Sequence, residues 1–298
     1  MNISVIIPTY RNTKILIQNL KHNLPYLDGC EVIVVNDYPK ESIKKDLNQF
    51  PQVKLIENMT NKGFSGAVNT GVGEASQKYI LLLNDDVKLL NKSYEKALKQ
   101  FDENPFLFAV SFAQKEMNGT IVGKNMIYWK NGFLQHQAVK PDTAGPNAWA
   151  EGGSCLIDKQ KFEELHGFDE MFNPFYWEDI DLSYRAWKKG YKIEFNPDIR
   201  VEHHHETTIS THFQKDRIET IAYRNQFLFI WKNISAWDLI VSHKLYLVKM
   251  LIRAIMKNDV NFLEGFIQAM KRFPQVLIKH FQNPNIRSDH ELLQIFTQ

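Results

Sequence analysis

The chain has 298 residues, 44% of them hydrophobic, and a formal net charge of +2. This length allows a large hydrophobic core, in either one large domain or one domain with an appendage. The near-neutral charge excludes a surface that is basic throughout, so we expect no nucleic acid as a partner.

The first hundred residues alternate between short β-branched runs and amphipathic segments. The runs predict buried strands, and the segments, with apolar residues three and four positions apart, predict helices. We expect strands at 3–7, 31–35, 53–56 and 79–83, and helices at 13–24, 42–50, 63–76 and 93–101. Such alternation predicts an α/β fold, with a mostly parallel central sheet and helices on both of its faces.

Beyond residue 108 the regular alternation ends. We expect strands at 108–112, 120–122 and 192–195, and helices at 159–166 and 181–190. Residues 131–147 are polar and contain glycine and proline, which predicts a loop. From Glu206 onward the sequence predicts helices.

The cysteines and the apolar runs indicate the compartment. Cys30 and Cys155 are in no metal-binding spacing, and two cysteines do not make a disulfide framework. Residues 1–8 predict a strand ending in proline rather than a secretory signal, and no apolar run reaches the length of a membrane span. We therefore expect a cytoplasmic protein in a reducing environment.

Polar residues follow the predicted strands at the edge where ligands bind in open α/β sheets. Residues 9–11 follow the first strand, Asp37 the second, and Asp85 and Asp86 the fourth. Asp37 alone is equally typical of a turn, and a helix cap would explain one of the later pair but not both. Two carboxylates at a buried strand end repel each other unless a cation or hydrogen bonds compensate, which favours a metal site.

A second acidic group lies in the aromatic segment 175–182. Asp179 lies between Trp177 and Ile180, so its pKa is expected to be raised, as suits a general base. The alternative is that Asp181 caps the next helix and Glu178 is solvated.

Three consecutive histidines, 203–205, follow a strand-like Arg200-Val201 pair. Adjacent strand residues point to opposite faces, so at most two of the three share a side. We expect one metal ligand among them.

The segment Asn61–Gly66 is glycine-rich and precedes a predicted helix. Its backbone N–H groups and the Lys62 side chain suit a diphosphate, although the spacing does not match a P-loop or a dinucleotide fingerprint. The alternative is a plain strand–helix connection.

Together these motifs resemble family 2 glycosyltransferases of the GT-A fold, in particular the bacterial rhamnosyltransferase-like and galactofuranosyltransferase-like members. The residues that carry the resemblance are Val5–Tyr10, Val34–Asp37, Asn61–Gly66, Leu83–Val87, Gly167–Asp169 and Trp177–Leu182. The resemblance implies a GT-A catalytic domain over residues 1–230 and a helical C-terminal extension over 231–298.

The resemblance also implies roles for individual residues. Donor-binding residues would be Thr9, Tyr10, Arg11, Asp37, Lys62, Gly63, Phe64 and Asp85, and acceptor-binding residues Trp149, Trp177 and Glu178. Asp179 would be the catalytic base, and Asp86 and His203 would hold Mg²⁺ or Mn²⁺. The chain departs from the family pattern at Asn84, where an Asp is usual, and at 206–208, where small residues are usual.

The implied reaction is inverting transfer of a sugar from a UDP- or dTDP-sugar to a hydroxyl of a glycan or lipid-linked glycan, as in bacterial surface polysaccharide synthesis. One alternative is a sugar-phosphate nucleotidyltransferase, although residues 8–12 lack the glycine that its phosphate loop would carry. The other is a non-catalytic carbohydrate-binding protein, which would need only one of the acidic groups.

The C-terminal region is locally basic. Residues 236–281 contain seven Lys or Arg and three Asp or Glu, so their net charge is +7 − 3 = +4. Within them, 239–281 has apolar residues at helical spacing. One interpretation is a helical appendage that packs on the catalytic domain or on a second subunit of a homodimer. The other is a peripheral contact with an anionic membrane surface, at the inner face of the plasma membrane.

Overall fold

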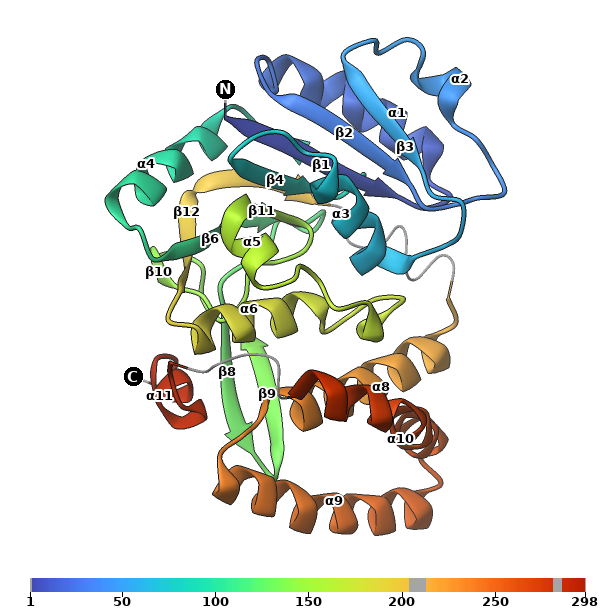
Figure 1. Ribbon diagram of the computed structural model, residues 1–298, viewed down its shortest axis with the longest axis vertical. Helices are drawn as coiled ribbons and strands as arrows, with labels where there is room; N and C mark the ends of the chain where they lie inside the picture. Colours follow the sequence, from blue (N-terminus) through green and yellow to red (C-terminus); the bar gives the residue numbers. More distant parts are fainter. Residues whose placement is uncertain (1, 204–212, 281–285, 298) are drawn as a thin grey trace.

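The computed structural model describes residues 2–203, 213–280 and 286–297 of the chain (Figure 1). A twisted sheet with helices on both faces forms the upper part of the molecule in this view. A group of helices that includes α8 (Lys215–Asn233), α9 (Trp237–Lys257) and α10 (Val260–His280) forms the lower part. The structure therefore has the predicted α/β fold followed by C-terminal helices.

The main sheet contains ten strands in the described residues, and the eight along its path run in the order β10-β12-β6-β11-β4-β1-β2-β3. Strand β1 is parallel to β2 and β4, and β11 is antiparallel to both β4 and β6. The strands are β1 (Ile3–Thr9), β2 (Glu31–Asn36), β3 (Val53–Glu57), β4 (Tyr79–Leu83), β5 (Val87–Leu89), β6 (Leu107–Lys115), β7 (Ile121–Val122), β10 (Gly145–Pro146), β11 (Ser154–Asp158) and β12 (Lys192–His203).

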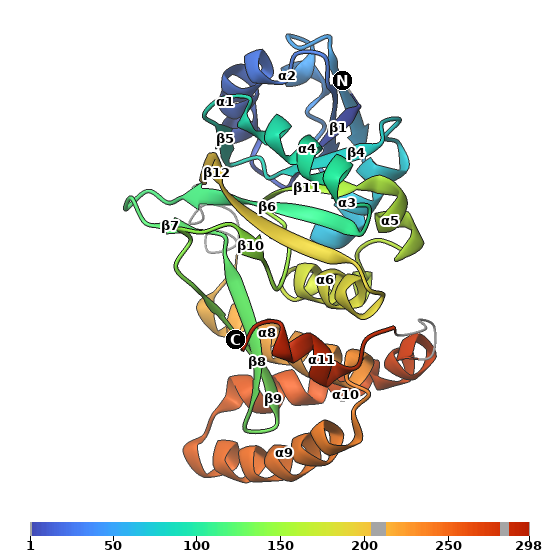
Figure 2. The same cartoon turned by 90° about the vertical axis from the view of Figure 1, so that its left-hand side faces the viewer.

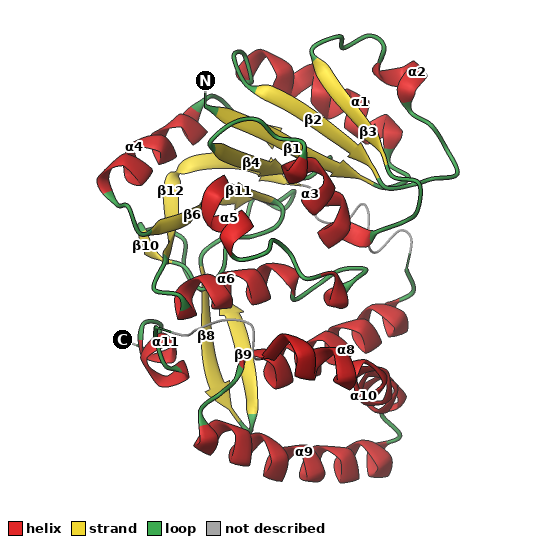
Figure 3. Ribbon diagram, in the orientation of Figure 1, coloured by secondary structure: helices red, strands yellow, loops and turns green. Residues whose placement is uncertain are grey.

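Helices cover both faces of this sheet (Figure 3). The helices that precede α8 are α1 (Thr13–Asn23), α2 (Lys44–Leu47), α3 (Gly63–Gly73), α4 (Lys96–Glu103), α5 (Lys159–Glu164) and α6 (Glu178–Lys188). A short α11 (Asp289–Gln294) follows α10, and 3₁₀ turns lie at Leu24–Tyr26, Ser93–Glu95 and Glu170–Phe172.

Alternate residues of the central strands enter two separate hydrophobic cores. Ile6 of β1 packs in one core with α3, α5 and α6, whereas its neighbours Val5 and Ile7 pack in the other with α1 and α4. Side chains alternate between the faces of a strand, so a strand buried on both sides is apolar at every position. This explains why the continuous apolar runs correctly predicted the central strands.

The predicted loop at 131–147 is wrong over much of its length. The strands β8 (Asn125–Lys130) and β9 (Phe133–Ala138) form a separate two-stranded antiparallel hairpin, and β9 lies within the predicted loop. Asn131 and Gly132 connect the strands, and both have positive φ angles, of 53° and 74°. Asn-Gly is the pair that such a two-residue turn favours. The turn signal was present in the sequence, and the polar residues around it concealed the strands.

Helix α6 begins earlier than the predicted helix at 181–190. Its first residue is Glu178, so Glu178, Asp179 and Asp181 all lie in the first turn. Asp181 is therefore inside the helix rather than at its cap, and Glu178 is buried rather than solvated. Both features of the alternative interpretation of this segment are excluded.

Helix α8 joins the C-terminal helices to the catalytic fold through buried ion pairs. Lys232 Nζ contacts Asp169 Oδ2 at 2.7 Å and Asp181 Oδ1 at 2.8 Å. Arg185 Nε donates to Asp181 at 2.8 Å, and Lys279 contacts Asp169. The boundary expected at residue 230 falls within this helix, three residues before its end.

The hairpin β8–β9 connects the sheet with α9 (Figure 2). His243 Nδ1 lies 2.8 Å from the carbonyl oxygen of Gly132, at the turn. A Cβ atom at Gly132 would lie 2.6 Å from Cβ of Tyr246, so only glycine allows this close approach. Among the helices of the described residues, none has the length and apolarity required to cross a membrane.

Replacing Lys232 with Met should destabilise the fold, because the substitution leaves the buried Asp181 and Asp169 carboxylates with less compensating charge. We expect the free energy of unfolding in urea to fall by about 3 kcal/mol. Lys99→Met is the matched control, since Lys99 forms an exposed ion pair with Glu103 at 3.6 Å and should change the stability by less than about 1 kcal/mol. Equal effects of the two substitutions would contradict this role of Lys232.

Candidate active site

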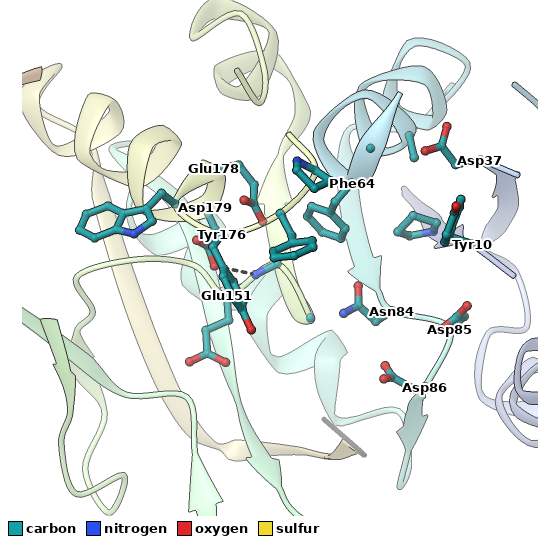
Figure 4. A pocket seen from close by; sticks show the side chains of 18 of the residues that line it. Tyr10, Asp37, Phe64, Asn84, Asp85, Asp86, Glu151, Tyr176, Glu178 and Asp179 are labelled. Atoms are coloured by element: carbon teal, nitrogen blue, oxygen red, sulfur yellow. Dashed lines mark hydrogen bonds between the residues drawn. The ribbon is translucent and has the colours of Figure 1, made fainter. Parts of the chain in front are cut away.

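A cleft of about 550 Å³ opens at the carboxyl ends of β1 and β4 and at the beginning of α6. Figure 4 shows Glu178 and Asp179 on one side of it and Asn84, Asp85 and Asp86 on the other. The predicted site residues that line the cleft are Thr9, Tyr10, Asp37, Gly63, Phe64, Asp85, Asp86, Trp149, Trp177, Glu178, Asp179 and His203. The two acidic groups, far apart in the sequence, thus face one cavity.

Two of the residues predicted to bind the sugar donor, Arg11 and Lys62, are not among the described residues that line the cleft. The Arg11 guanidinium lies 5.3 Å from the centre of the Tyr38 ring, and Lys62 Nζ donates to Thr70 Oγ1 at 3.2 Å. Arg11 can still stiffen the rim, because Tyr38 packs edge-on against the lining residue Tyr10. Lys62 takes part through its backbone, as described below.

The turn after β4 is held by side chains of β1 and α1. Thr9 Oγ1 donates to one oxygen of Asp85 at 2.6 Å, and Asn12 donates to the other at 3.0 Å. The Asn19 side chain donates to the Asp85 carbonyl at 2.7 Å. Burial and the neighbouring charge of Asp86 raise the pKa of Asp85 to about 7. Neither Asp85 nor Asp86 caps a helix, since the next helical turn begins at Ser93.

A chain of hydrogen bonds fixes the orientation of His203. Gln114 donates its amide to Glu151 Oε2 at 2.6 Å, and a carboxylate only accepts, so the Gln114 oxygen faces the other way. That oxygen lies 2.5 Å from His203 Nδ1, which must therefore donate. His203 Nε2 is left facing Asp86 Oδ1 at 3.2 Å. Gly153 makes room for the ring, because a Cβ there would lie 2.6 Å from His203 Cε1.

This arrangement fits a divalent cation. Because Nδ1 donates to Gln114, Nε2 is the ring nitrogen left to bind a metal, and it faces the Asp86 carboxylate. The side-chain oxygen of Asn84 is also buried there, without a hydrogen-bond partner in the described residues. Within those residues no group of three His, Cys, Asp or Glu side chains could hold a metal. Asp86 and His203 would therefore share the ion with substrate phosphate oxygens, as is usual for Mg²⁺. The positions of His204 and His205 lie outside the described residues.

The carboxylates of α6 have different environments. Asp179 receives hydrogen bonds from the backbone N–H of Ile180 at 2.8 Å and of Gly152 at 3.4 Å. Burial raises the pKa of Asp179 to about 6 in spite of these bonds. Burial and the charge of Asp179 raise the pKa of Glu178 well above its usual value, and Glu178 Oε2 has no partner in the described residues. At neutral pH Asp179 is therefore mostly ionised, and the surroundings of Glu178 favour its protonated form.

The backbone before α6 has an uncommon conformation. Tyr176 and Trp177 have φ angles of 70° and 75°, a left-handed region that bulky residues rarely adopt. The buried Asn225 side chain of α8 holds it, because its Nδ2 lies 2.6 Å from the Phe172 carbonyl, 3.0 Å from that of Phe175 and 2.8 Å from that of Tyr176. The first of the C-terminal helices is thus part of the support of the site.

An aromatic wall lines the cleft on the side of Glu178 and Asp179. His136, from the hairpin strand β9, packs edge-on against Trp149 and Trp177, with ring centroids 5.5 Å apart in each pair. Burial lowers the pKa of His136, so the imidazole is neutral at pH 7. Flat apolar ring faces with a few polar atoms suit the mixed surface of a sugar.

The glycine-rich segment is fixed through its backbone. Asp37 Oδ1 accepts hydrogen bonds from the Lys62 N–H at 2.9 Å and from the Asn58 side chain at 2.8 Å. Gly63 has a φ of 67°, and a Cβ there would lie 2.6 Å from Asn173 Oδ1. Asp37 thus supports this loop, and burial raises its pKa.

Sequence reasoning missed several residues that support the site. They are Asn12, Asn19, Gln114, His136, Glu151 and Asn225. Asn19 and Asn23 lie one turn apart on α1, and both are buried and hydrogen-bonded to the segment that contains Asp85. Two amides at this spacing on an otherwise apolar face were a usable signal. Gln114 and Glu151 showed no comparable signal in the sequence, because their hydrogen-bond partners are distant along the chain.

The sequence comparisons define the family. The model described as glycosyl transferase family 2 matches residues 4–165, and the model described as the N-terminal domain of galactosyltransferase matches residues 134–214. The first match covers more than half of the chain, which therefore belongs to glycosyl transferase family 2. The predicted family is confirmed.

Two relatives show how far the similarity extends. The putative glycosyltransferase EpsE of Bacillus subtilis is 23% identical over 269 residues, which cover 87% of this chain and 91% of that protein. Mouse polypeptide N-acetylgalactosaminyltransferase 5 is 26% identical over 213 residues, which cover 64% of this chain. Those residues are 23% of the mouse protein, so the chain spans about a quarter of that relative.

Solved structures confirm the GT-A fold. The structure titled GalNAc-T7 with UDP, GalNAc and Mn²⁺ matches with a TM-score of 0.59 and 16% identity, over 78% of this chain and 48% of the other. The mannosyltransferase PcManGT from Pyrobaculum calidifontis, in complex with GDP-Man and Mn²⁺, matches with a TM-score of 0.54 and 13% identity. That match covers 94% of this chain and 87% of the other.

Gln114→Leu should weaken metal binding, because the substitution removes the acceptor that orients His203. Loss of such an orienting partner typically costs about 10- to 100-fold in metal affinity. Titration of Mn²⁺ in the presence of nucleoside diphosphate, followed by electron paramagnetic resonance, measures this change. Gln137→Leu is the control, since Gln137 is exposed on β9. Unchanged Mn²⁺ affinity in Gln114→Leu would exclude the orienting role.

Proposed function

We propose that the protein is an inverting glycosyltransferase that moves a sugar from a UDP- or dTDP-sugar to a hydroxyl of a glycan or lipid-linked glycan. Bacterial surface polysaccharide synthesis is the proposed context. The observation that carries the proposal is the single cleft with Asp86 and His203 on one side and Asp179 on the other. Family membership, and the Mn²⁺ and nucleotide in the titles of similar structures, support it.

The donor would bind at the carboxyl ends of β1, β2 and β4. Thr9, Tyr10 and Asp37 line the nucleotide side of the cleft, and Gly63 and Phe64 line it at the beginning of α3. Asp85, fixed by Thr9 and Asn12, would lie beside the ribose or the donor sugar. Mg²⁺ or Mn²⁺, held by Asp86 and His203, would neutralise charge on the leaving diphosphate.

The acceptor would bind against Trp149 and Trp177 on the opposite side. Asp179 accepts the proton of the acceptor hydroxyl. The oxygen of that hydroxyl attacks the anomeric carbon of the donor sugar, and the bond between this carbon and the diphosphate oxygen breaks. Attack from the face opposite the leaving group inverts the anomeric configuration. Glu178, whose protonated form is favoured by burial and by the charge of Asp179, would donate a hydrogen bond to the acceptor, which would use its buried oxygen that has no partner in the described residues.

The products distinguish this reaction from the alternatives. Glycosyl transfer releases a nucleoside diphosphate, nucleotidyl transfer releases pyrophosphate, and a binding protein releases neither. A thermal-shift screen of UDP- and dTDP-sugars with Mn²⁺ should first identify the donor, since a ligand at 100 times its Kd stabilises by roughly 2.7 kcal/mol. Proton NMR of the product then gives the anomeric configuration, and retention would contradict the proposed mechanism.

Asp179→Asn should lower kcat by about 10²- to 10⁴-fold, because the amide cannot accept the acceptor proton. Donor affinity should stay unchanged, since Asp179 lies on the acceptor side. Glu178→Gln is the matched comparison: a neutral amide still donates a hydrogen bond, so we expect a loss of less than about tenfold. If Glu178→Gln has the larger effect, Glu178 is the base.

The rate should depend on pH through Asp179. Its pKa is raised to about 6, and only the ionised form is a base. As the pH falls through that value, kcat should halve near the pKa and then fall about tenfold for each further unit. The measurement uses saturating donor and Mn²⁺, so that Asp85 beside the metal site does not titrate freely. A flat profile between pH 7 and pH 5 would exclude Asp179 as the base.

A further inference from the structure

Helix α9 is apolar on two opposite sides. Its inner side contains the buried residues Leu239, His243 and Ala254, which pack toward the rest of the protein. Its outer side carries six large apolar residues in contact with solvent. These are Trp237, Leu245, Val248, Ile252, Ile255 and Met256, with exposed fractions between 54% and 82%. Core packing explains the inner side and leaves the outer side without an explanation.

The outer apolar residues form one stripe. Leu245, Val248, Ile252 and Ile255 follow each other at intervals of three and four residues, so they lie on the same face of the helix. At 3.6 residues per turn the six residues fall within an arc of about 100°. Monomeric proteins rarely expose a contiguous apolar stripe of this kind unless it binds something.

Cationic side chains border this stripe on both edges. In the projection along the helix axis Lys244 lies at one edge, and Lys249 and Arg253 lie at the other. With Lys257 and Asp238 included, the charge of α9 is +4 − 1 = +3. An apolar stripe with cations at its edges matches a surface that is apolar inside and anionic at its boundary, which describes an anionic lipid leaflet. A second copy of α9 would instead bring cations against cations.

We propose that the outer side of α9 binds an anionic membrane surface, with the helix lying in the plane of the lipid headgroups. The apolar stripe enters the boundary of the acyl chains, and Lys244, Lys249 and Arg253 contact lipid phosphates. None of the helices in the described ranges is suited to cross the bilayer, so the contact is peripheral.

The same helix is attached to the acceptor side of the cleft. The β8–β9 turn packs on the inner side of α9, where His243 contacts the Gly132 carbonyl and Trp129 Nε1 donates to Ser242 Oγ at 3.4 Å. Strand β9 then carries His136 to the aromatic wall of the cleft. This last step rests on the proposed glycosyl transfer: membrane binding would place the aromatic wall near acceptors that are anchored in lipid.

Vesicle flotation of the full chain, without nucleotide sugar, tests the proposal. Vesicles of phosphatidylcholine with phosphatidylglycerol should carry the protein upward, and vesicles of phosphatidylcholine alone should bind it far more weakly. The variant Lys244→Glu, Lys249→Glu, Arg253→Glu should lower the partition coefficient on the order of 100-fold. Leu245→Ser, Ile252→Ser, Ile255→Ser should also abolish flotation. All six positions are exposed, so circular dichroism should show folded variants.

Matched substitutions outside α9 test whether membrane binding requires the α9 stripe or any exposed cationic and apolar residues. Lys40→Glu, Lys44→Glu, Lys45→Glu and the pair Met59→Ser, Met117→Ser alter exposed residues of other elements and should float as the wild type does. Absence of wild-type flotation, or equal flotation of the α9 variants, would overturn the proposal. So would a dimer in light scattering that the Leu245 variant converts to a monomer, because a second copy would then cover the stripe. Since no donor is present, these outcomes are independent of whether the protein transfers sugars.

Discussion

The structure depends on how it compensates buried negative charge. A buried carboxylate is stable only with a cation, with hydrogen bonds or in its protonated form. Asp181 is compensated within the chain, by Arg185 and Lys232. The carboxylates of the cleft are in a different situation. Asp85 accepts hydrogen bonds from neutral donors, Asp86 lies beside a histidine nitrogen, and the pKa of Glu178 is raised by burial and by the charge of Asp179. The first kind of compensation holds the fold together, and the second leaves capacity for a cation and for a substrate.

This difference also explains why α8 belongs with the site. Lys232 neutralises carboxylates on either side of the segment that leads into α6, and Asn225 and Arg224 bind the carbonyl groups of that segment. The left-handed conformations of Tyr176 and Trp177 persist because these contacts hold them. The boundary expected at residue 230 thus divides a helix that supports the site, since Arg224 and Asn225 precede this boundary and Lys232 follows it.

Local signals in the sequence were sufficient for the central sheet and for the residues at its edge. The continuous apolar runs 3–7, 31–35 and 79–83 are buried on both faces, and Asp37, Asp85 and Asp86 follow them directly. The hairpin was missed although Asn131-Gly132 marks it, because its strands are only partly buried and their pattern is mixed. The start of α6 and the contact of Gln114 with His203 depend on tertiary contacts, which one sequence does not reveal. The direction of the Lys62 side chain, which points to Thr70, could not be predicted either, because it depends on a contact within the folded structure.

In the described residues the β8–β9 hairpin forms a sheet separate from β1, β2 and β4, which line the other end of the cleft. It nevertheless supplies His136 to the opposite end. In the proposed reaction, lengthening, shortening or replacing this hairpin would reshape the acceptor end of the cleft and leave the donor end unaffected. Under that proposal, evolution can change which hydroxyl is modified while the activated sugar stays the same.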